Sequence, residues 1–218
     1  MGIAPTRSTD QISHMSTPDS ILATYDRVGP AWASSRDRRL TERRWLDRMI
    51  AVAPHDRGKR RVLDLGCGSG RPIAEYLIDR GISVTGVDGA ESMIALFQTN
   101  LPNARSIRAD MRSLDLGETF DAILAWDSFF HLSPADQRAM FAIFAAHAAE
   151  NAALMFTSGP DEGVSIGSVE GTPIYHASLS EAGYRHELEA AGFTVVAHKA
   201  EDPDCGDRTV WLARFTGV

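Results

Sequence analysis

The chain has 218 residues, 44% of them hydrophobic and 23% charged, which indicates a single globular domain with a sizeable core. No apolar run approaches the ~20 residues that span a bilayer, and residues 1–18 lack the apolar segment of a secretory signal, so we expect a cytoplasmic protein. The net charge is −7, and the two cysteines, Cys67 and Cys205, are too few for a disulfide framework or a metal cluster.

The N-terminal part predicts a flexible tail over residues 1–18, followed by helices that cover one end of a single domain spanning 19–218. A first helix is expected over 20–28, ended by Gly29-Pro30. A second is expected over about 37–52, because its apolar residues recur on one helical face. We assign residues 19–53 to this helical cover.

Residues 27–61 are strongly basic, with 11 of the 22 Lys and Arg residues and only four acids. This stretch is either a solvated face balanced by acidic neighbours or a surface that attracts RNA or an anionic substrate. Only Trp32 and Trp45 interleave aromatic rings with these charges, which argues against a nucleic-acid platform.

A glycine-rich motif follows the basic stretch, where Val62-Leu63-Asp64-Leu65 leads into Gly66, Gly68 and Gly70. The pattern predicts a buried strand over 62–66, a tight turn and a helix over 71–80. Glycine permits a positive φ and leaves no Cβ between the loop and a ligand. A second strand, over 82–87, ends in Asp88, and an acid at that position suits the hydroxyls of a ribose.

The spacing of the motif distinguishes between nucleotide cofactors. A dinucleotide-binding turn has the pattern G-x-G-x-x-G, but its third glycine would here be Arg71. The observed pattern is D-x-G-x-G-x-G, in which Asp64 would repel a pyrophosphate and attract an ammonium group. S-adenosylmethionine carries an ammonium group and a ribose but no phosphate, whereas a nicotinamide cofactor is disfavoured.

With this motif the chain resembles the class I S-adenosylmethionine-dependent methyltransferases, in their small-molecule branch, from about residue 40 to the C-terminus. The following segments fit, since strands are expected at 105–109, 121–126 and 152–157 and helices at 91–99 and 134–149. The resemblance implies an α/β, Rossmann-like, doubly wound sheet of seven strands with helices on both faces. Its strand order would be 3-2-1-4-5-7-6, with strand seven antiparallel.

The C-terminal part interrupts the regular alternation with a glycine-rich insertion at 161–176 that could form a hairpin. Ser178 and Glu181 have the spacing of a capping box and predict a helix that ends before Gly192. Strands at 193–198 and 209–215 are joined by a short turn, so they must be antiparallel.

The carboxyl ends of the strands hold the candidate site, because open parallel sheets bind ligands there. In the resembled family, an acid after the third strand accepts from the adenine amino group, and the backbone after the fourth strand holds the methionine ammonium. The predicted cofactor-binding residues are Asp64, Gly66, Cys67, Gly68, Gly70, Asp88, Gly89, Met93, Asp110, Met111, Trp126 and Asp127.

The acceptor side is predicted from the residues after the fourth strand and from the two irregular segments. Phe129 and Phe130 would border the methyl group or fill the core, and Tyr25, Trp32 and Tyr175 would contact the substrate. His131 and His176 are the candidate bases, with a structural role for His131 as the alternative. No cluster has metal-ligand spacing, so we expect no metal.

These patterns predict methyl transfer from S-adenosylmethionine, yielding S-adenosylhomocysteine, to an oxygen or nitrogen of a small molecule. Two alternatives remain open: an RNA methyltransferase that uses residues 27–61, and a non-catalytic protein that binds the cofactor. Nucleic acid and membrane partners are not expected. The substrate-facing segments carry no motif that identifies the acceptor.

Overall fold

The computed structural model describes residues 16–55 and 58–217. Residues 1–15 of the expected tail lie outside that range. Residues 16–18 do not behave as a tail, because the Ser16 hydroxyl accepts a hydrogen bond from the Tyr175 backbone N–H at 2.9 Å. Pro18 already begins a short 3₁₀ helix, so the expectation of a free tail up to residue 18 is wrong for its last three residues.

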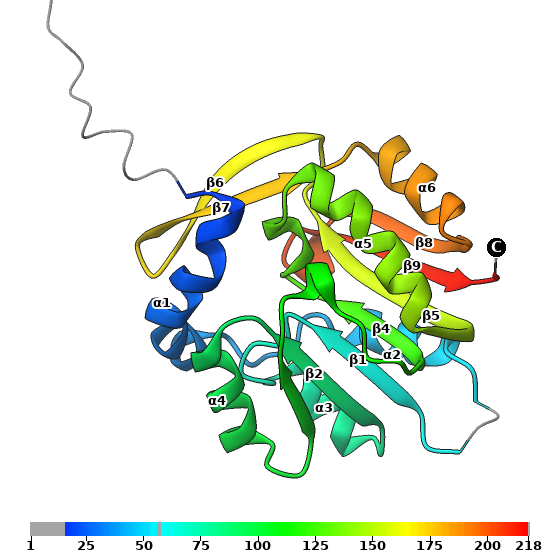
Figure 1. Cartoon of the computed structure of the whole chain (residues 1–218), viewed down its shortest axis with the longest axis horizontal. Helices are drawn as coiled ribbons and strands as arrows, with labels where there is room; N and C mark the ends of the chain where they lie inside the picture. The colour runs from blue at the N-terminus through cyan, green and yellow to red at the C-terminus, as the bar shows by residue number, and fades with distance from the viewer. Residues whose placement is uncertain (1–15, 56–57, 218) are drawn as a thin grey trace, which may run out of the picture.

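Helices and strands alternate through most of the chain (Figure 1). The strands are β1 (Arg61–Leu65), β2 (Ser83–Asp88), β3 (Arg105–Arg108), β4 (Phe120–Ala125), β5 (Ala148–Ser158), β6 (Gly163–Val169), β7 (Thr172–Ser178), β8 (Phe193–Asp202) and β9 (Arg208–Phe215). The α-helices are α1 (Ile21–Ser35), α2 (Arg43–Val52), α3 (Ile73–Asp79), α4 (Glu91–Asn100), α5 (Pro134–His147) and α6 (Glu181–Ala190). The 3₁₀ helices are η2 (Pro18–Ser20), η3 (Met111–Ser113), η4 (Phe129–His131) and η5 (Pro203–Cys205).

Seven strands form one sheet in the order β3-β2-β1-β4-β5-β9-β8. β9 is antiparallel to both of its neighbours, β5 and β8, and the pairs from β3 to β5 are parallel. This confirms the predicted order and the antiparallel seventh strand. The order reverses between β1 and β4, which is where doubly wound sheets bind ligands.

Alternating residues of the central strands face two separate cores. On β1, Leu63 and Leu65 pack in one core with α5 and α6, whereas Val62 packs in the other with α2 and α3. Because both faces are covered, β4 is buried at every position. Helices therefore lie on both faces of the sheet.

Two segments are added at the carboxyl end of the sheet. The insertion forms an antiparallel hairpin of β6 and β7, and α1 lies beside it (Figure 1). Ile21 of α1 packs with Ile174 and Tyr175 of the hairpin in a small third core. The two segments therefore form one continuous cover over the end of the sheet.

The structure corrects three local predictions from the sequence. Helix α1 continues through Gly29-Pro30, where the missing side chain of Gly29 lets α1 approach Met93 of α4 closely. Helix α2 begins at Arg43 instead of residue 37, after Leu40 adopts a positive φ of 53°.

The third correction concerns the start of α6. Its N-cap is Ser180, whose side chain accepts a hydrogen bond from the Gly183 N–H. Ser178 instead ends β7, and its hydroxyl accepts from the Gly159 N–H at 2.7 Å. A local capping motif was thus displaced by pairing between segments distant in the sequence.

Candidate active site

The turn after β1 is held close to the ends of β2 and β4. The N–H groups of Gly66 and Cys67 both donate to the Val87 carbonyl, at 2.7 and 3.1 Å. Gly66 has a φ of 74°, and a Cβ there would lie 2.2 Å from the Cβ of Ser128. Ser128 is itself fixed, because its hydroxyl donates to the Leu65 carbonyl. The site therefore requires glycine at position 66.

Asp88 joins the turn to the end of β2. Its carboxylate accepts from the Gly68 N–H at 3.0 Å and from the Ala90 N–H at 2.9 Å. Burial raises the pKa of Asp88, and these two backbone donors oppose that rise. The two backbone donors therefore orient the carboxylate, which also lines the cavity described next.

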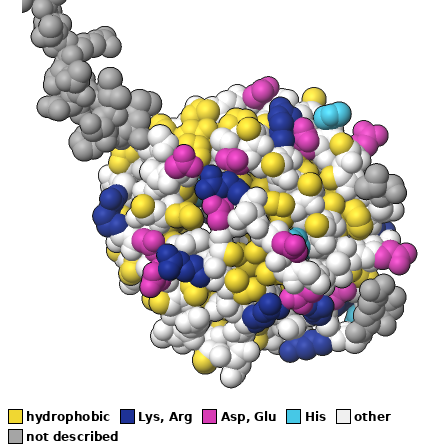
Figure 2. Space-filling view, viewed as in Figure 1, with side chains coloured by type: hydrophobic (Ala, Val, Ile, Leu, Met, Phe, Trp, Pro, Cys, Tyr) yellow, Lys and Arg dark blue, Asp and Glu magenta, His cyan; other side chains and the backbone are white. Residues whose placement is uncertain are grey.

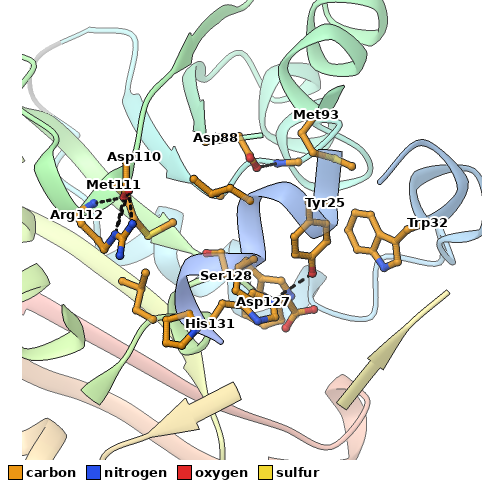
Figure 3. A pocket seen from close by; sticks show the side chains of 18 of the residues that line it. Tyr25, Trp32, Asp88, Met93, Asp110, Met111, Arg112, Asp127, Ser128 and His131 are labelled. Atoms are coloured by element: carbon orange, nitrogen blue, oxygen red, sulfur yellow. Dashed lines mark hydrogen bonds and ion pairs between the residues drawn. The ribbon is translucent and has the colours of Figure 1, made fainter. Parts of the chain in front are cut away.

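The main cavity lies above this turn and has a volume of about 770 Å³, including the solvent at its mouth. Gly66, Gly68 and Gly89 form part of its floor, and the side chains of Met93 and Met111 line its walls. Helix α1 crosses the cavity and contributes Leu22 and Tyr25 to its lining (Figure 3). The cavity is thus a polar floor enclosed by apolar walls.

Asp64 lies beside the floor of this cavity and is only 4% exposed. Burial, with a further contribution from the charge of Asp88, raises the pKa of Asp64 to about 7. The charge that opposes this rise belongs to Arg36, at the C-terminal end of α1. Arg36 and Asp88 both line the cavity, whereas Asp64 is buried behind its lining.

Asp110 lines the opposite end of the cavity and is engaged by Arg112 (Figure 3). The Arg112 guanidinium donates to both carboxylate oxygens, and the Arg112 backbone N–H donates to Oδ1 at 2.9 Å. These bonds lower the pKa of Asp110. Asp110 therefore caps η3 in addition to facing the cavity.

The end of β4 contributes Trp126 and Asp127. The indole N–H of Trp126 is buried and has no hydrogen-bond partner among the described residues. Asp127 adopts a φ of 49°, and both of its carboxylate oxygens accept from the guanidinium of Arg208 on β9. The Asp127 N–H donates to the Thr157 hydroxyl at 2.8 Å. Strand ends β4, β5 and β9 thus fix this carboxylate.

A second cavity adjoins the first and shares with it Tyr25, Trp32, Asp127 and His131. It has a volume of about 1750 Å³, including open solvent, and the hairpin and the segment after β5 form its outer wall. The boundary between the two cavities therefore contains both residues predicted to contact the cofactor and residues predicted to contact the substrate.

His131 lies at that boundary with both ring nitrogens occupied. Its Nδ1 lies 2.8 Å from the Tyr175 carbonyl, which can only accept, so Nδ1 carries the proton. Its Nε2 then accepts from the Tyr25 hydroxyl at 3.1 Å. Burial lowers the pKa of His131 to about 4 and raises that of Tyr25. His131 is therefore neutral near pH 7 and anchors Tyr25.

His176 of β7 and Phe130 line only the second cavity. The His176 ring lies 4.9 Å from the His131 ring and 4.8 Å from the Phe130 ring, measured between centroids. Burial lowers the pKa of His176, whereas the charge of Asp127 opposes that change. His176 is the more accessible of the two predicted bases.

Several predicted site residues lie outside both cavities. Phe129 is fully buried in the core with Phe141 and Phe156, so the prediction that it borders the substrate is not supported by its position. Tyr175 packs its ring in the third core and contributes only backbone atoms near the site. Cys67, Gly70 and Asp64 support the turn without lining the cavities.

Gly70 has a structural reason for lacking a side chain. A Cβ there would lie 2.6 Å from Leu101 and 2.8 Å from Phe97, so glycine is needed for helix packing. Two arginines of the site, Arg36 and Arg208, were missed by sequence reasoning. Arg36 belonged to a stretch treated only as a charged surface, and Arg208 lies 81 residues from its partner Asp127.

Five arginines of the basic stretch, among the residues that the structure describes, form ion pairs with acids. Arg43 pairs with Asp47, Arg44 with Asp204 and Arg61 with Glu118. On the face seen in Figure 2, basic and acidic side chains are interspersed. This arrangement favours the solvated-face interpretation of residues 27–61 over a nucleic-acid surface.

Over 16–55 and 58–217, no group of three or more His, Cys, Asp and Glu side chains is arranged to hold a metal ion. Over the same ranges, no helix is both long and apolar enough to cross a membrane.

Comparisons with known proteins converge on one kind of domain. Residues 62–151 match the family described as "Methyltransferase domain". The chain is 31% identical over 94 residues to a ubiquinone biosynthesis O-methyltransferase of Pseudomonas entomophila, covering 40% of this chain and 38% of that protein. The chain therefore aligns with about two fifths of the length of these curated relatives.

Solved structures match over nearly the whole chain. An amino pentose methyltransferase from Micromonospora echinaspora, described with S-adenosylmethionine bound, superposes with a TM-score of 0.67 at 21% identity, covering 99% of this chain and 100% of that one. The 1,6-didemethyltoxoflavin N1-methyltransferase of Burkholderia thailandensis gives 0.67 at 20% identity, covering 99% and 94%. At these identities the match establishes the fold.

Proposed function

We propose that the chain, whose residues 62–151 match the family described as "Methyltransferase domain", is a class I S-adenosylmethionine-dependent methyltransferase that transfers a methyl group to an oxygen or nitrogen of a small molecule. The observation that carries the proposal is the pair of adjoining cavities at the carboxyl end of the sheet. One suits a nucleoside, and the other leaves room for an acceptor beside it.

The main cavity fits the nucleoside part of this cofactor. Asp88 is already oriented by two backbone donors and would accept from the ribose hydroxyls. The side chains of Met93 and Met111 would contact the adenine, with Asp110 at its edge. A Cβ at Gly68 would clash with no protein atom and would enter the cavity. Glycine there is explained by a ligand close to the backbone.

The methionine end of the cofactor has its own partners. Asp64 would attract the ammonium group, and Arg36 would bind the carboxylate, because each carries the opposite charge. The buried Trp126 N–H, which has no hydrogen-bond partner in residues 16–55 and 58–217, is a second donor for that carboxylate. The ammonium charge would favour the ionised form of Asp64 and so oppose the rise in pKa that burial causes.

The cofactor supplies an already activated methyl group, so the protein mainly has to position the acceptor and exclude water. Orientation alone can supply about 7–11 kcal/mol of barrier reduction. Helix α1 covers the cavity, and Tyr25, fixed by His131, stands between the two cavities. His176 faces the acceptor side and is the residue best placed to take up a proton.

The two alternatives have less support. Ion pairs of Arg43, Arg44 and Arg61 with acids reduce the positive charge that residues 27–61 could offer to RNA. A protein that only binds the cofactor would not need a second cavity that shares Asp127 and His131 with the first. The absence of a metal site among the described residues carries no further conclusion.

Calorimetry with S-adenosylhomocysteine tests the cofactor assignment. We expect a micromolar dissociation constant, about −8 kcal/mol. The Asp88→Ala variant loses a charged acceptor and should bind about 1.5–3 kcal/mol more weakly. Glu91→Ala, an exposed acid three residues away, is the matched control. Equal binding by wild type and Asp88→Ala, or tighter binding of NAD, would refute the assignment.

Catalysis is tested separately from binding. Metabolite extracts are incubated with the protein and deuteromethyl-labelled S-adenosylmethionine, and mass spectrometry then searches for a product that carries the label. A labelled small molecule is expected. Cofactor binding without any labelled product would favour the non-catalytic alternative, and labelled RNA would favour the other.

A further inference from the structure

We propose that the methyl acceptor is an amine that is cationic near neutral pH. The carboxylates that line the second cavity would attract it. This inference rests on the proposed function and narrows its acceptor atom to nitrogen. One arginine, Arg208, lines the second cavity together with five acids: Asp127, Asp161, Glu162, Glu170 and Asp207. The cavity adjoins the cofactor site through Asp127, so a bound acceptor would lie next to the methyl group.

The single arginine does not offset the acidic wall. Arg208 is committed to Asp127, donating to both carboxylate oxygens at 2.8 to 3.0 Å. Within residues 16–55 and 58–217, the other four acids form no ion pair. Glu170 accepts a hydrogen bond from the Ser35 hydroxyl, which is an uncharged donor. The cavity therefore carries an uncompensated negative charge.

The inner part of the cavity also suits a cation. The rings of Tyr25, Trp32 and Phe130 line it, and aromatic faces attract ammonium groups. Burial lowers the pKa of both His131 and His176, so neither imidazole adds positive charge at neutral pH. An anionic acceptor would meet carboxylates without a free cation, and an alcohol would gain nothing from the charge.

A cationic amine needs a proton acceptor before it can react. The ammonium proton passes to the neutral ring of His176, which frees the nitrogen lone pair to form the new N–C bond. The electron pair of the broken S–C bond stays on the sulfur of the donor. Because His176 is partly exposed at the cavity wall, it can return the proton to solvent. Atoms and charge balance without another reactant.

Binding of three matched probes tests the charge preference directly. Calorimetry on the S-adenosylhomocysteine-loaded protein compares 2-phenylethylammonium, 2-phenylethanol and 3-phenylpropanoate at pH 7 and low salt. We expect the ammonium probe to bind at least tenfold more tightly than the alcohol, the carboxylate to bind most weakly, and added salt to weaken the ammonium probe. An equal or reversed order would overturn the inference.

Charge-neutralising variants locate the preference in the cavity. The double variant Asp161→Asn/Glu162→Gln should lose most of the preference for the ammonium probe. Asp79→Asn/Glu189→Gln, on exposed positions of α3 and α6 outside the cavity, removes the same charge and should retain it. An equal loss in both double variants would mean that net charge, not the cavity, selects the probe.

The labelled product decides the acceptor atom even where the small probes bind weakly. Fragmentation of the deuteromethylated product should place the label on the nitrogen of a basic amine. A label on oxygen, or on an anionic acceptor, would refute this inference and leave the proposed methyl transfer intact. Failure of the protein to bind S-adenosylhomocysteine would instead refute the proposed function itself.

Discussion

The two cavities that meet at Tyr25 and Asp127 are built from different parts of the molecule. The main cavity, which we assign to the cofactor, is floored by backbone turns at the ends of β1 and β2 and is lined by the carboxylates of Asp88 and Asp110. The acceptor cavity is walled by the hairpin and the segment after β5, with exposed charged side chains. Substitutions in the main cavity should therefore disturb both folding and cofactor binding. Substitutions in the second cavity should alter only the binding and methylation of the acceptor.

The largest expected effect separates two neighbouring glycines of the cofactor cavity. Gly66→Ala combines a positive φ with a clash against Ser128, and should reduce the free energy of unfolding by about 4 kcal/mol. Gly68→Ala should reduce it by only about 1 kcal/mol, because its Cβ has space, yet it should abolish cofactor binding. Chemical denaturation and calorimetry measure the two effects.

Gly117→Ala is the control for these variants, because Gly117 has a φ of 63° in open space and lies in neither cavity. It should show the backbone strain alone. Cofactor binding by Gly68→Ala at wild-type strength would contradict the view that this glycine leaves room for a ligand.

The next effect concerns the buried charge of Asp64. Its pKa is raised to about 7, above the ~3.9 of an unfolded chain, so the folded state holds the proton more tightly between these values. Stability contributed by the protonated form is therefore lost as pH rises through about 7. Asp64→Asn lacks this loss and should be about 4 kcal/mol more stable than wild type at pH 8.

The gain from Asp64→Asn should disappear as the pH approaches 4, where the wild-type carboxyl is protonated in both states. The variant should also bind S-adenosylhomocysteine more weakly at pH 8, since it offers no charge to the ammonium. Urea unfolding at both pH values checks the stability, with the exposed Asp79→Asn as control. A variant that is less stable at pH 8 would show that Asp64 is needed in its charged form for folding.

A smaller effect is expected on the acceptor side. His176→Asn should lower turnover about 10²-fold if His176 takes up the proton, with cofactor affinity changed less than twofold. His186→Asn, an exposed histidine on α6, is the control. Steady-state kinetics with the identified acceptor measure the effect. A comparable loss of cofactor affinity would mean that the two cavities are not separable at this residue.

The smallest predicted effect lies at the boundary itself. Tyr25→Phe removes the hydroxyl that donates to His131 and should cost about 1 kcal/mol, which lowers the melting temperature by about 2–4 °C. Because Tyr25 lines both cavities, turnover should fall as well. Tyr76→Phe removes a comparable hydroxyl contact to Asp47 far from the site and should leave turnover unchanged.

The sequence alone determined the sheet and the floor of the cofactor cavity. The positions of Gly66, Gly68 and Asp88 follow from local patterns: apolar runs, glycines at turns and acids at strand ends. The strand order, with its antiparallel last strand, follows from the family resemblance that these motifs carry. These features can be predicted from the sequence because each depends on residues nearby in the chain and on the burial of the strands.

Only the tertiary structure decided how α1 and the β6–β7 hairpin pack over the end of the sheet. It carried α1 through Pro30 to pack against α4, buried Phe129 in the core, and brought Arg208 to Asp127 and Tyr25 to His131. These pairs join residues more than 80 positions apart, and their formation depends on packing that no local pattern encodes. The acceptor cavity is therefore the part of this protein that its sequence specifies only through its fold.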